Sequence, residues 1–135
     1  MTRELTNKRI AKRTMLSLAG AICLAVAGFA QSAQFPEARD LVQRVQEDMR
    51  KSADFARQTP AIHKDRKQIE RWDNAQRSMS NFDRNLSKGK FDKGELDGAI
   101  NDLKNVVDHN TLSSEDRDML NRDLGDLRQF RANHD

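Results

Sequence analysis

The sequence predicts an all-α protein: a small four-helix bundle, or a pair of antiparallel helical hairpins, after an N-terminal signal peptide. Three observations predict this fold. After residue 30, Gly and Pro are scarce and β-branched residues are few, while Asp, Arg, Asn, Gln, Leu and Ala dominate. No long stretch alternates apolar with polar residues, as a half-buried strand would. Apolar residues recur instead at helical spacing, in four segments joined by short links.

Residues 1–30 have the composition of a secretory signal peptide. Basic residues come first, and the sixteen residues Met15–Ala30 carry no charge. A basic region, a short apolar region and small residues at the exit are the parts of such a signal. We expect cleavage after Ala30, with Ala27 or Ala33 as alternatives, and Sec-type export to the periplasm or the cell exterior. The minor alternative is an uncleaved membrane anchor, for which this segment falls short of the roughly 20 residues that span a bilayer.

Removal of the signal peptide changes the charge of the chain. The full sequence of 135 residues has 24 Lys and Arg against 21 Asp and Glu, whereas residues 31–135 have 19 against 20. The high isoelectric point therefore comes from the signal peptide, and we expect no nucleic-acid partner. The only cysteine, Cys23, leaves with this segment, so the mature chain forms no disulfide. Its length suits one hydrophobic core, which predicts a single helical domain over 31–135.

The first helix is expected over 36–58. Pro36 suits a first helical turn, where its missing N–H would have no partner. Apolar residues share one face of the helix, an arc of about 120°. They are Ala38, Leu41, Val42, Val45, Met49, Ala53 and Ala56. Phe55 lies off this face. Thr59 and Pro60 are expected to end this helix and begin the next, as N-cap and first residue.

The second and longest helix is expected over 60–87, without a break. Its heptad pattern gives two seams. One seam holds Ile62, Ile69, Gln76 and Asp83; the other holds Asp65, Trp72, Met79 and Leu86, with Ala75 and Phe82 beside them. Because Asp65, Gln76 and Asp83 interrupt the seams, we expect the two ends of the helix to overhang the core. The alternative is a buried polar layer that fixes the helix register.

The stretch Asp83–Glu95 places oxygen-bearing side chains before a glycine, as an EF-hand calcium loop does. Counted from Asp83, the early oxygen ligands are present, but Gly89 and Glu95 each lie one position late. Counted from Arg84, the glycine and the glutamate are in place, but the early ligands are lost. Neither register satisfies the ligand requirement, so the sequence predicts a turn between two helices.

The third helix is expected over 93–109. Gly89 takes the left-handed conformation that closes the preceding helix. Asp92 is the predicted N-cap, with Glu95 completing a capping box and Phe91 packing against the first apolar residue of the new helix, Leu96. The apolar face holds Leu96, Ala99, Ile100, Leu103, Val106 and Val107.

The fourth helix is expected over 114–131. Asn110 is predicted to stop the third helix in a left-handed conformation. Ser113 is the predicted N-cap, and Glu115 and Asp116 lie near the positive end of the helix dipole. The apolar face holds Leu120, Leu124, Leu127 and Phe130, with Met119 at its edge. Short links favour antiparallel neighbours, which is why a bundle or two hairpins are expected.

The mature chain is poor in groups that carry catalysis, and we expect no enzyme, no catalytic residue, no cofactor and no metal site. It has no Cys or Tyr, and its three histidines, His63, His109 and His134, lie on separate segments. No His-x3-His or Glu-x-x-His pair places two ligands on one helical face. The alternative function is a periplasmic carrier of haem or a metal, held inside the bundle by Met49 or Met79 with His109.

Charge is distributed unevenly along the chain. Residues 31–93 hold 14 basic and 10 acidic side chains, whereas residues 94–135 hold 5 and 10. Lys64, Lys67 and Arg71 lie along one face of the second predicted helix, with three acids interspersed. An ordinary solvated face also mixes signs in this way. The functional interpretation is an exported, non-enzymatic protein that binds a protein or an anionic envelope component through these three residues, or that associates with itself.

Overall fold

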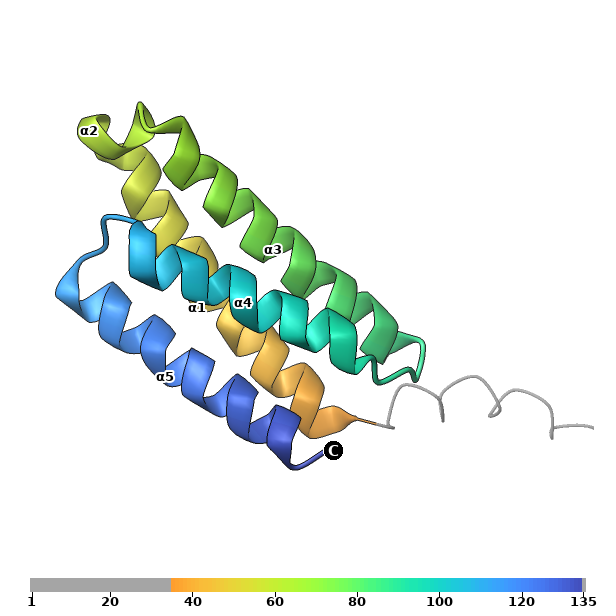
Figure 1. Ribbon diagram of the computed structural model, residues 1–135. Helices are drawn as coiled ribbons and strands as arrows, with labels where there is room; N and C mark the ends of the chain where they lie inside the picture. The colour runs from red at the N-terminus through yellow and green to blue at the C-terminus, as the bar shows by residue number, and fades with distance from the viewer. Residues whose placement is uncertain (1–34, 135) are drawn as a thin grey trace, which may run out of the picture.

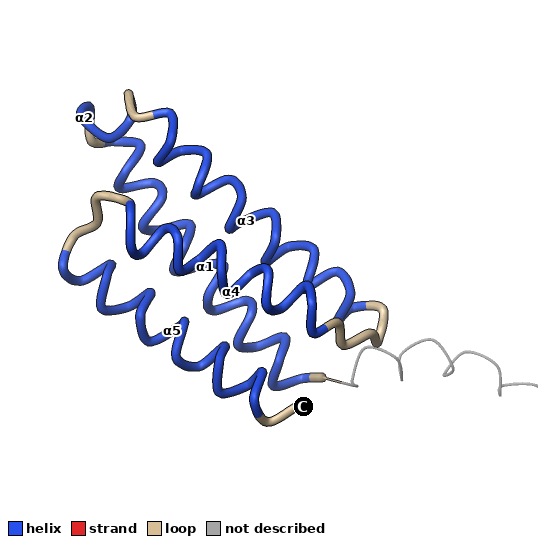
Figure 2. Tube along the Cα trace, in the orientation of Figure 1, coloured by secondary structure: helices blue, strands red, loops and turns tan. Residues whose placement is uncertain are grey.

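The computed structural model describes residues 35–134, and these form five α-helices (Figure 1). They are α1 (Pro36–Gln58), α2 (Pro60–His63), α3 (Arg66–Ser87), α4 (Lys93–His109) and α5 (Ser114–Ala132). The described residues contain no strand (Figure 2), so the predicted all-α fold is confirmed. None of these helices has the length and apolar content that a bilayer span requires. The predicted signal peptide and its cleavage site lie outside the described residues.

The four long helices form a ring around one core. α1 packs against α3 and α5, and α4 packs against the same two helices, most closely against α3. Within residues 35–134, the backbones of α1 and α4, and those of α3 and α5, do not approach each other closely across the ring. Successive long helices run in opposite directions (Figure 1), which is the up-down-up-down order of a four-helix bundle. α2 is a single turn that carries the chain from α1 to α3 at one end of the bundle.

The core follows a heptad spacing that is clearest in α3. Its buried residues alternate steps of four and three. They are Gln68, Trp72, Ala75, Met79, Phe82 and Leu86. The predicted seam through Trp72 is therefore buried, but the second buried seam runs through Gln68 and Phe82. In the other predicted seam, of Ile62, Ile69, Gln76 and Asp83, only Ile62 is buried. The other three side chains are half-buried, so this seam is wrong within α3. Burial of the large rings of Trp72 and Phe82 removes more apolar area from water than burial of Ile69, Gln76 and Asp83 would. The face that carries the two rings is therefore the one turned toward the core.

The helix predicted over 60–87 is interrupted at Lys64 and Asp65, and the prediction of an unbroken helix is wrong. Asp65 does not extend a seam but caps α3. Its Oδ1 accepts hydrogen bonds from the backbone N–H groups of Lys67 (3.0 Å) and Gln68 (3.3 Å). A short acidic side chain that binds the backbone in this way starts a helix and does not continue one. Ile62, in α2, is buried against the end of the bundle.

The turn between α3 and α4 has the predicted glycine stop and the predicted N-cap. Gly89 has φ 71°, the left-handed region that glycine adopts without strain. Its N–H donates to the Leu86 carbonyl, and the N–H of Lys90 donates to the Asn85 carbonyl, both at 2.9 Å. These two bonds form a Schellman motif, which ends α3. Asp92 then caps α4, accepting a hydrogen bond from the Glu95 N–H at 3.0 Å.

The link between α4 and α5 departs from its prediction at Asn110. This residue has φ −95° and ψ 152°, so it is extended, and the prediction of a left-handed stop is wrong. Asn110 is buried, and its Nδ2 donates to the Gln68 carbonyl at 3.1 Å. A bond to another helix holds the chain extended here. Ser113 does cap α5 as predicted, because its Oγ accepts from the Asp116 N–H at 3.0 Å.

The opposite end of the bundle is closed by an aromatic cluster around Phe91. Its ring centroid lies 5.8 Å from Phe35, 5.9 Å from Phe82 and 5.7 Å from Phe130. The His134 ring lies 5.2 Å away. Tilted and edge-to-face contacts at these distances are favourable for aromatic pairs. The cluster therefore joins the α3–α4 turn to both the first and the last helix.

Candidate functional site

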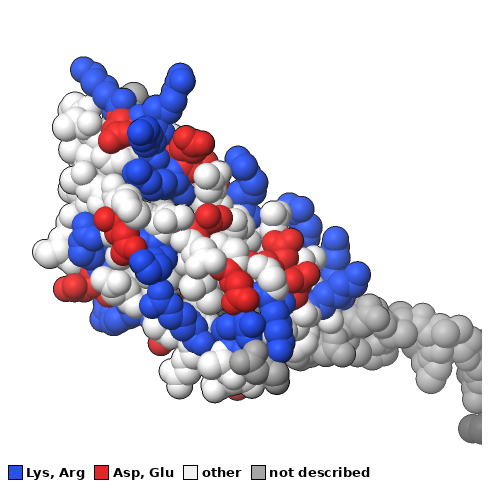
Figure 3. All heavy atoms as spheres, viewed as in Figure 1, with Lys and Arg blue, Asp and Glu red and all other residues white. Residues whose placement is uncertain are grey.

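The predicted basic residues lie at the end of the bundle that carries α2. Lys64 and Lys67 are exposed, and so is Arg66 between them. None of the three forms an ion pair with an acid in the described part of the chain. Figure 3 shows Lys and Arg side chains projecting at the end of the molecule where Figure 1 places α2. We call Lys64, Arg66 and Lys67 the basic tip.

Arg71, the third residue of the predicted basic face, has a structural role. Its Nη1 donates to the His109 carbonyl at 3.3 Å and to Asn110 Oδ1 at 3.2 Å. A guanidinium in this position satisfies a terminal carbonyl of α4 and is favoured by the negative end of the helix dipole. Arg71 therefore ties α4 to α3. Its place in the exposed group is taken by Arg66, which sequence reasoning missed because it placed residue 66 inside a longer helix.

The acid within the basic tip is turned toward the backbone. Asp65 Oδ2 accepts a hydrogen bond from Gln68 Nε2 at 3.0 Å, in addition to the two capping bonds on Oδ1. The Gln68 side-chain bond, followed by the backbone bonds, lowers the pKa of Asp65 below its ordinary value. The carboxylate thus stays ionised and bound to the start of α3. Its charge offsets one of the three cations, which leaves the tip with a net positive charge.

An exposed aromatic residue lies near the tip. Phe55 is 53% exposed and is the one large hydrophobic side chain left exposed in residues 35–134. It belongs to the last turns of α1, and its carbonyl accepts a hydrogen bond from Thr59 Oγ1 at 3.1 Å, just before α2 begins. Its position off the apolar face was correctly read from the sequence. Exposed cations and an exposed phenyl group therefore occur at the same end of the molecule.

Buried polar contacts anchor the tip to the rest of the bundle. Gln68 Oε1 accepts from the Thr111 N–H at 2.7 Å, and the Gln68 carbonyl accepts from Asn110. The first turn of α3 is thereby fixed to the α4–α5 link. Four buried polar residues escaped the sequence reasoning: Ser52, Gln68, Asn110 and Asp123. The readable signal for Gln68 was its place three residues after Asp65, a spacing typical of a helix start.

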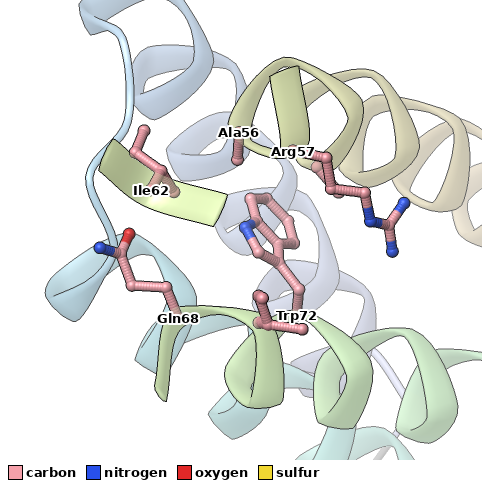
Figure 4. A pocket seen from close by; sticks show the side chains of 7 residues that line it. Ala56, Arg57, Ile62, Gln68 and Trp72 are labelled. Atoms are coloured by element: carbon pink, nitrogen blue, oxygen red, sulfur yellow. The ribbon is translucent and has the colours of Figure 1, made fainter. Parts of the chain in front are cut away.

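A small apolar recess lies beneath the tip, between α1, α2 and α3. Figure 4 shows the indole of Trp72 rising from α3 toward Ala56 of α1, beside Ile62 of α2. The cavity volume is about 10 Å³, which is about the space that one water needs. Trp72 Nε1 is buried without a hydrogen-bond acceptor among the described residues. The recess therefore has room for about one water molecule.

A larger recess of about 250 Å³ lies between α1 and α5. It is lined by Arg44, Asp48, Met119, Arg122, Asp123 and Asp126. Asp123 is only 2% exposed. Its Oδ1 lies 3.3 Å from Arg44 Nε, whereas its Oδ2 has no hydrogen-bond partner among the described residues. Arg44 also pairs with Asp126. Burial raises the pKa of Asp123 to about 6, helped by the Asp48 carboxylate and opposed by Arg44.

The residues considered for a haem or metal site do not converge. Met49 and Met79 are fully buried and fill the core, whereas His109 is exposed at the end of α4. The Ser78 hydroxyl donates to Asp102, which places Met79 level with that part of α4, about two turns from His109. The side chain of His63 lies outside the described part of the structure. Among the described residues, no group of three or more His, Cys, Asp or Glu side chains is arranged to hold a metal ion.

Charged side chains gather both at the recess between α1 and α5 and at the basic tip. Comparisons with known protein families, with curated proteins and with solved structures found no match for this chain.

Proposed function

We propose that this is an exported, non-enzymatic helical protein that binds the anionic lipid surface of the cell envelope through its basic tip. The observation that supports the proposal is the exposure of Lys64, Arg66 and Lys67 together, without an acid partner, at one end of the bundle. The net positive charge that is left after Asp65 offsets one of the three cations remains available to an external anion. Lipid phosphates are the anions that an envelope surface offers in greatest density.

The expected strength of this contact is modest. Each Lys or Arg close to an anionic bilayer contributes about 1 kcal/mol. Three such residues therefore give a weak, reversible attachment that salt screens. The exposed ring of Phe55 supports the same reading, because an aromatic side chain near the headgroups adds apolar contact to the electrostatic attraction. The rest of the bundle then projects from the surface.

The test is a pelleting assay of the purified mature chain, residues 31–135, with vesicles. We expect binding to vesicles of phosphatidylglycerol and phosphatidylcholine at low salt, and little binding to phosphatidylcholine alone. The triple variant Lys64→Glu, Arg66→Glu, Lys67→Glu should bind the anionic vesicles at least tenfold more weakly. Raising the salt to 1 M should release the unaltered protein, because the Debye length falls to about 3 Å.

The matched control changes three exposed arginines elsewhere: Arg50→Glu, Arg77→Glu and Arg128→Glu. This variant has the same net charge as the tip variant but keeps the tip, so it should bind within about twofold of the unaltered protein. Circular dichroism verifies that both variants are folded. Equal loss of binding in the two variants, or equal binding to neutral vesicles, would refute the proposal; pelleting only when a host protein is added would point to a protein partner instead.

A further inference from the structure

We propose that the recess between α1 and α5 is a binding site for the ammonium group of an unbranched aliphatic amine. The site is independent of the basic tip and of the proposed attachment to lipid. Its floor is the carboxylate of Asp123, which lies 2% exposed between the two helices. Its sides carry two more carboxylates, Asp48 and Asp126, and two guanidinium groups, Arg44 and Arg122.

The unsatisfied oxygen of Asp123 is the first observation that points to a ligand. Arg44 Nε lies 3.3 Å from Oδ1, but Oδ2 has no hydrogen-bond partner among the described residues. A buried carboxylate oxygen without a donor is costly, and the cost is removed by a positively charged donor placed beside it. The second nearby carboxylate, Asp48, increases the attraction for such a donor.

The charges around the recess leave a place for one positive charge. Three carboxylates face two guanidinium groups, so one negative charge is not compensated. The adjacent Lys51 forms ion pairs with both Glu47 (3.0 Å) and Asp48 (3.6 Å). Lys51 and Glu47 together add no net charge to this sum. A monovalent cation completes the balance. A divalent metal would exceed it and would need more oxygens than remain, since Arg44 already binds both Asp123 and Asp126.

The shape and lining of the recess select an alkylammonium ion among monovalent cations. An ammonium group is compact and has three donors, which suits a recess lined by the carboxylates of Asp123 and Asp48. Met119 provides an apolar wall for a methylene chain. The volume of about 250 Å³ lies just below the roughly 300–1,000 Å³ of pockets for drug-sized ligands. A short chain therefore fits, either as a free amine or as the lysine side chain of a partner.

The test is a titration of the full chain with n-butylammonium chloride, followed by NMR. At pH 7.5 we expect saturable shifts of the Met119 methyl and Asp123 amide signals, and none with n-butanol or with sodium chloride at equal ionic strength. Asp123→Asn should weaken binding at least tenfold. Asp118→Asn, which removes an exposed acid from the same helix outside the recess, should leave the affinity within about twofold.

The pH dependence gives an independent readout. Because the pKa of Asp123 is raised to about 6, only about a tenth of the carboxylate is ionised at pH 5. Amine affinity should therefore fall about tenfold between pH 7.5 and pH 5 in the unaltered protein, and much less in Asp123→Asn. Asp48→Asn is the second variant, expected to bind several-fold more weakly, and it decides the question if Asp123→Asn does not fold.

Two further titrations separate the sources of the amine. n-Pentylamine, which carries one positive charge, represents a free amine, and Nα-acetyl-lysine methylamide represents a lysine side chain. Saturation by either one supports the site, and the ligand that binds more tightly identifies the source of the amine. The proposal is overturned if n-butanol produces the same shifts as the amine. It is equally overturned if magnesium chloride binds the recess more tightly, or if neither Asp123→Asn nor Asp48→Asn alters the affinity.

Discussion

Asp123 is an acidic residue that is held away from water. It is buried between α1 and α5, and one of its oxygens has no hydrogen-bond partner among the described residues. Burial, helped by the Asp48 carboxylate, raises its pKa from 3.8 to about 6 although Arg44 favours the ionised form. The folded protein therefore binds this proton more tightly than the unfolded chain does. The resulting stability is complete below about pH 4 and is lost as the pH rises through about 6.

We therefore expect Asp123→Asn to stabilise the protein at neutral pH. An amide has no charge to bury, and its oxygen can still accept a hydrogen bond from Arg44. The raised pKa of about 6 corresponds to roughly 1–3 kcal/mol of unfolding free energy at pH 7.5. The advantage should disappear near pH 4, where the unaltered carboxyl is protonated. Urea denaturation followed by circular dichroism at pH 4, 5, 6 and 7.5 measures the difference.

Asp118→Asn is the control for this pH series. Asp118 is exposed on the same helix, so its replacement should change the unfolding free energy by less than about 0.5 kcal/mol at each pH. If Asp123→Asn were destabilising at pH 7.5, the ion pair with Arg44 would outweigh the cost of burial. That result would contradict the direction given for the Asp123 pKa.

Single residues were predictable where their role is local. Gly89, Asp92 and Ser113 act within a few residues of their own position, and the structure places each in the predicted cap. Ser52 and Gln68 were missed because their roles depend on other helices. The Ser52 hydroxyl donates to Asp116 of α5 at 2.7 Å, a contact between residues 64 positions apart. Helical spacing indicates which positions are buried. It does not indicate the hydrogen-bond partner that a buried polar residue needs, because that partner lies far away in the sequence.

The helix elements follow their predicted ranges except at one place. α1 and α4 begin and end where the spacing of apolar residues predicts, and α5 ends one residue later. The break between α2 and α3 was missed because a helix of four residues is too short to show a period of its own. The signal was present in the spacing of Asp65 and Gln68, which is that of a helix start. The prediction of one unbroken helix relied on the apolar periodicity of residues 60–87 and gave no weight to this spacing.

The start of α3 offers a prediction at the scale of the element. Asp65→Ala removes the acceptor for the N–H groups of Lys67 and Gln68 and for Gln68 Nε2. We expect the first turn of α3 to open more readily while the bundle stays folded. Hydrogen exchange of the amides of residues 67 and 68 should become roughly tenfold faster, because these donors lose their cap.

The companion variant is Asp73→Ala, which removes an exposed acid from the middle of α3. Amide exchange at residues 67 and 68 should be unchanged in it. Unchanged exchange in Asp65→Ala as well would show that the start of α3 is held by its tertiary contacts alone, and not by its cap.

The whole molecule is held by one core that all four long helices share. α4 packs most closely against α3, and its Leu103 is a fully buried member of the core cluster. The contact between α1 and α5 closes the ring, which distinguishes a bundle from two separate hairpins. The sequence predicts four amphipathic helices but leaves this alternative open, because the apolar faces of α1 and α5 are far apart in the chain. The pairing of α1 with α5 depends on how the other helix pairs pack against each other.

At this scale we expect Leu103→Ala to cost roughly 2–5 kcal/mol of unfolding free energy, through lost burial and the cavity left behind. Urea denaturation at pH 7.5 measures the loss. Asn121→Ala, an exposed position on α5, should remain within about 0.5 kcal/mol of the unaltered protein. A loss below 1 kcal/mol for Leu103→Ala would mean that the neighbouring helices close the cavity, and that the core is softer than its packing indicates.

The aromatic cluster around Phe91 has a mechanical consequence. Phe35 and His134, near the two limits of the described chain, both contact the ring of Phe91. The 22 residues of α3 separate this point from the basic tip by about 33 Å. The bundle is thus a short rod, and the described chain begins and ends at the same end of it. A fluorescent label or a solid support attached at either limit would leave the far end unobstructed, and a short linker could join the two limits without crossing it.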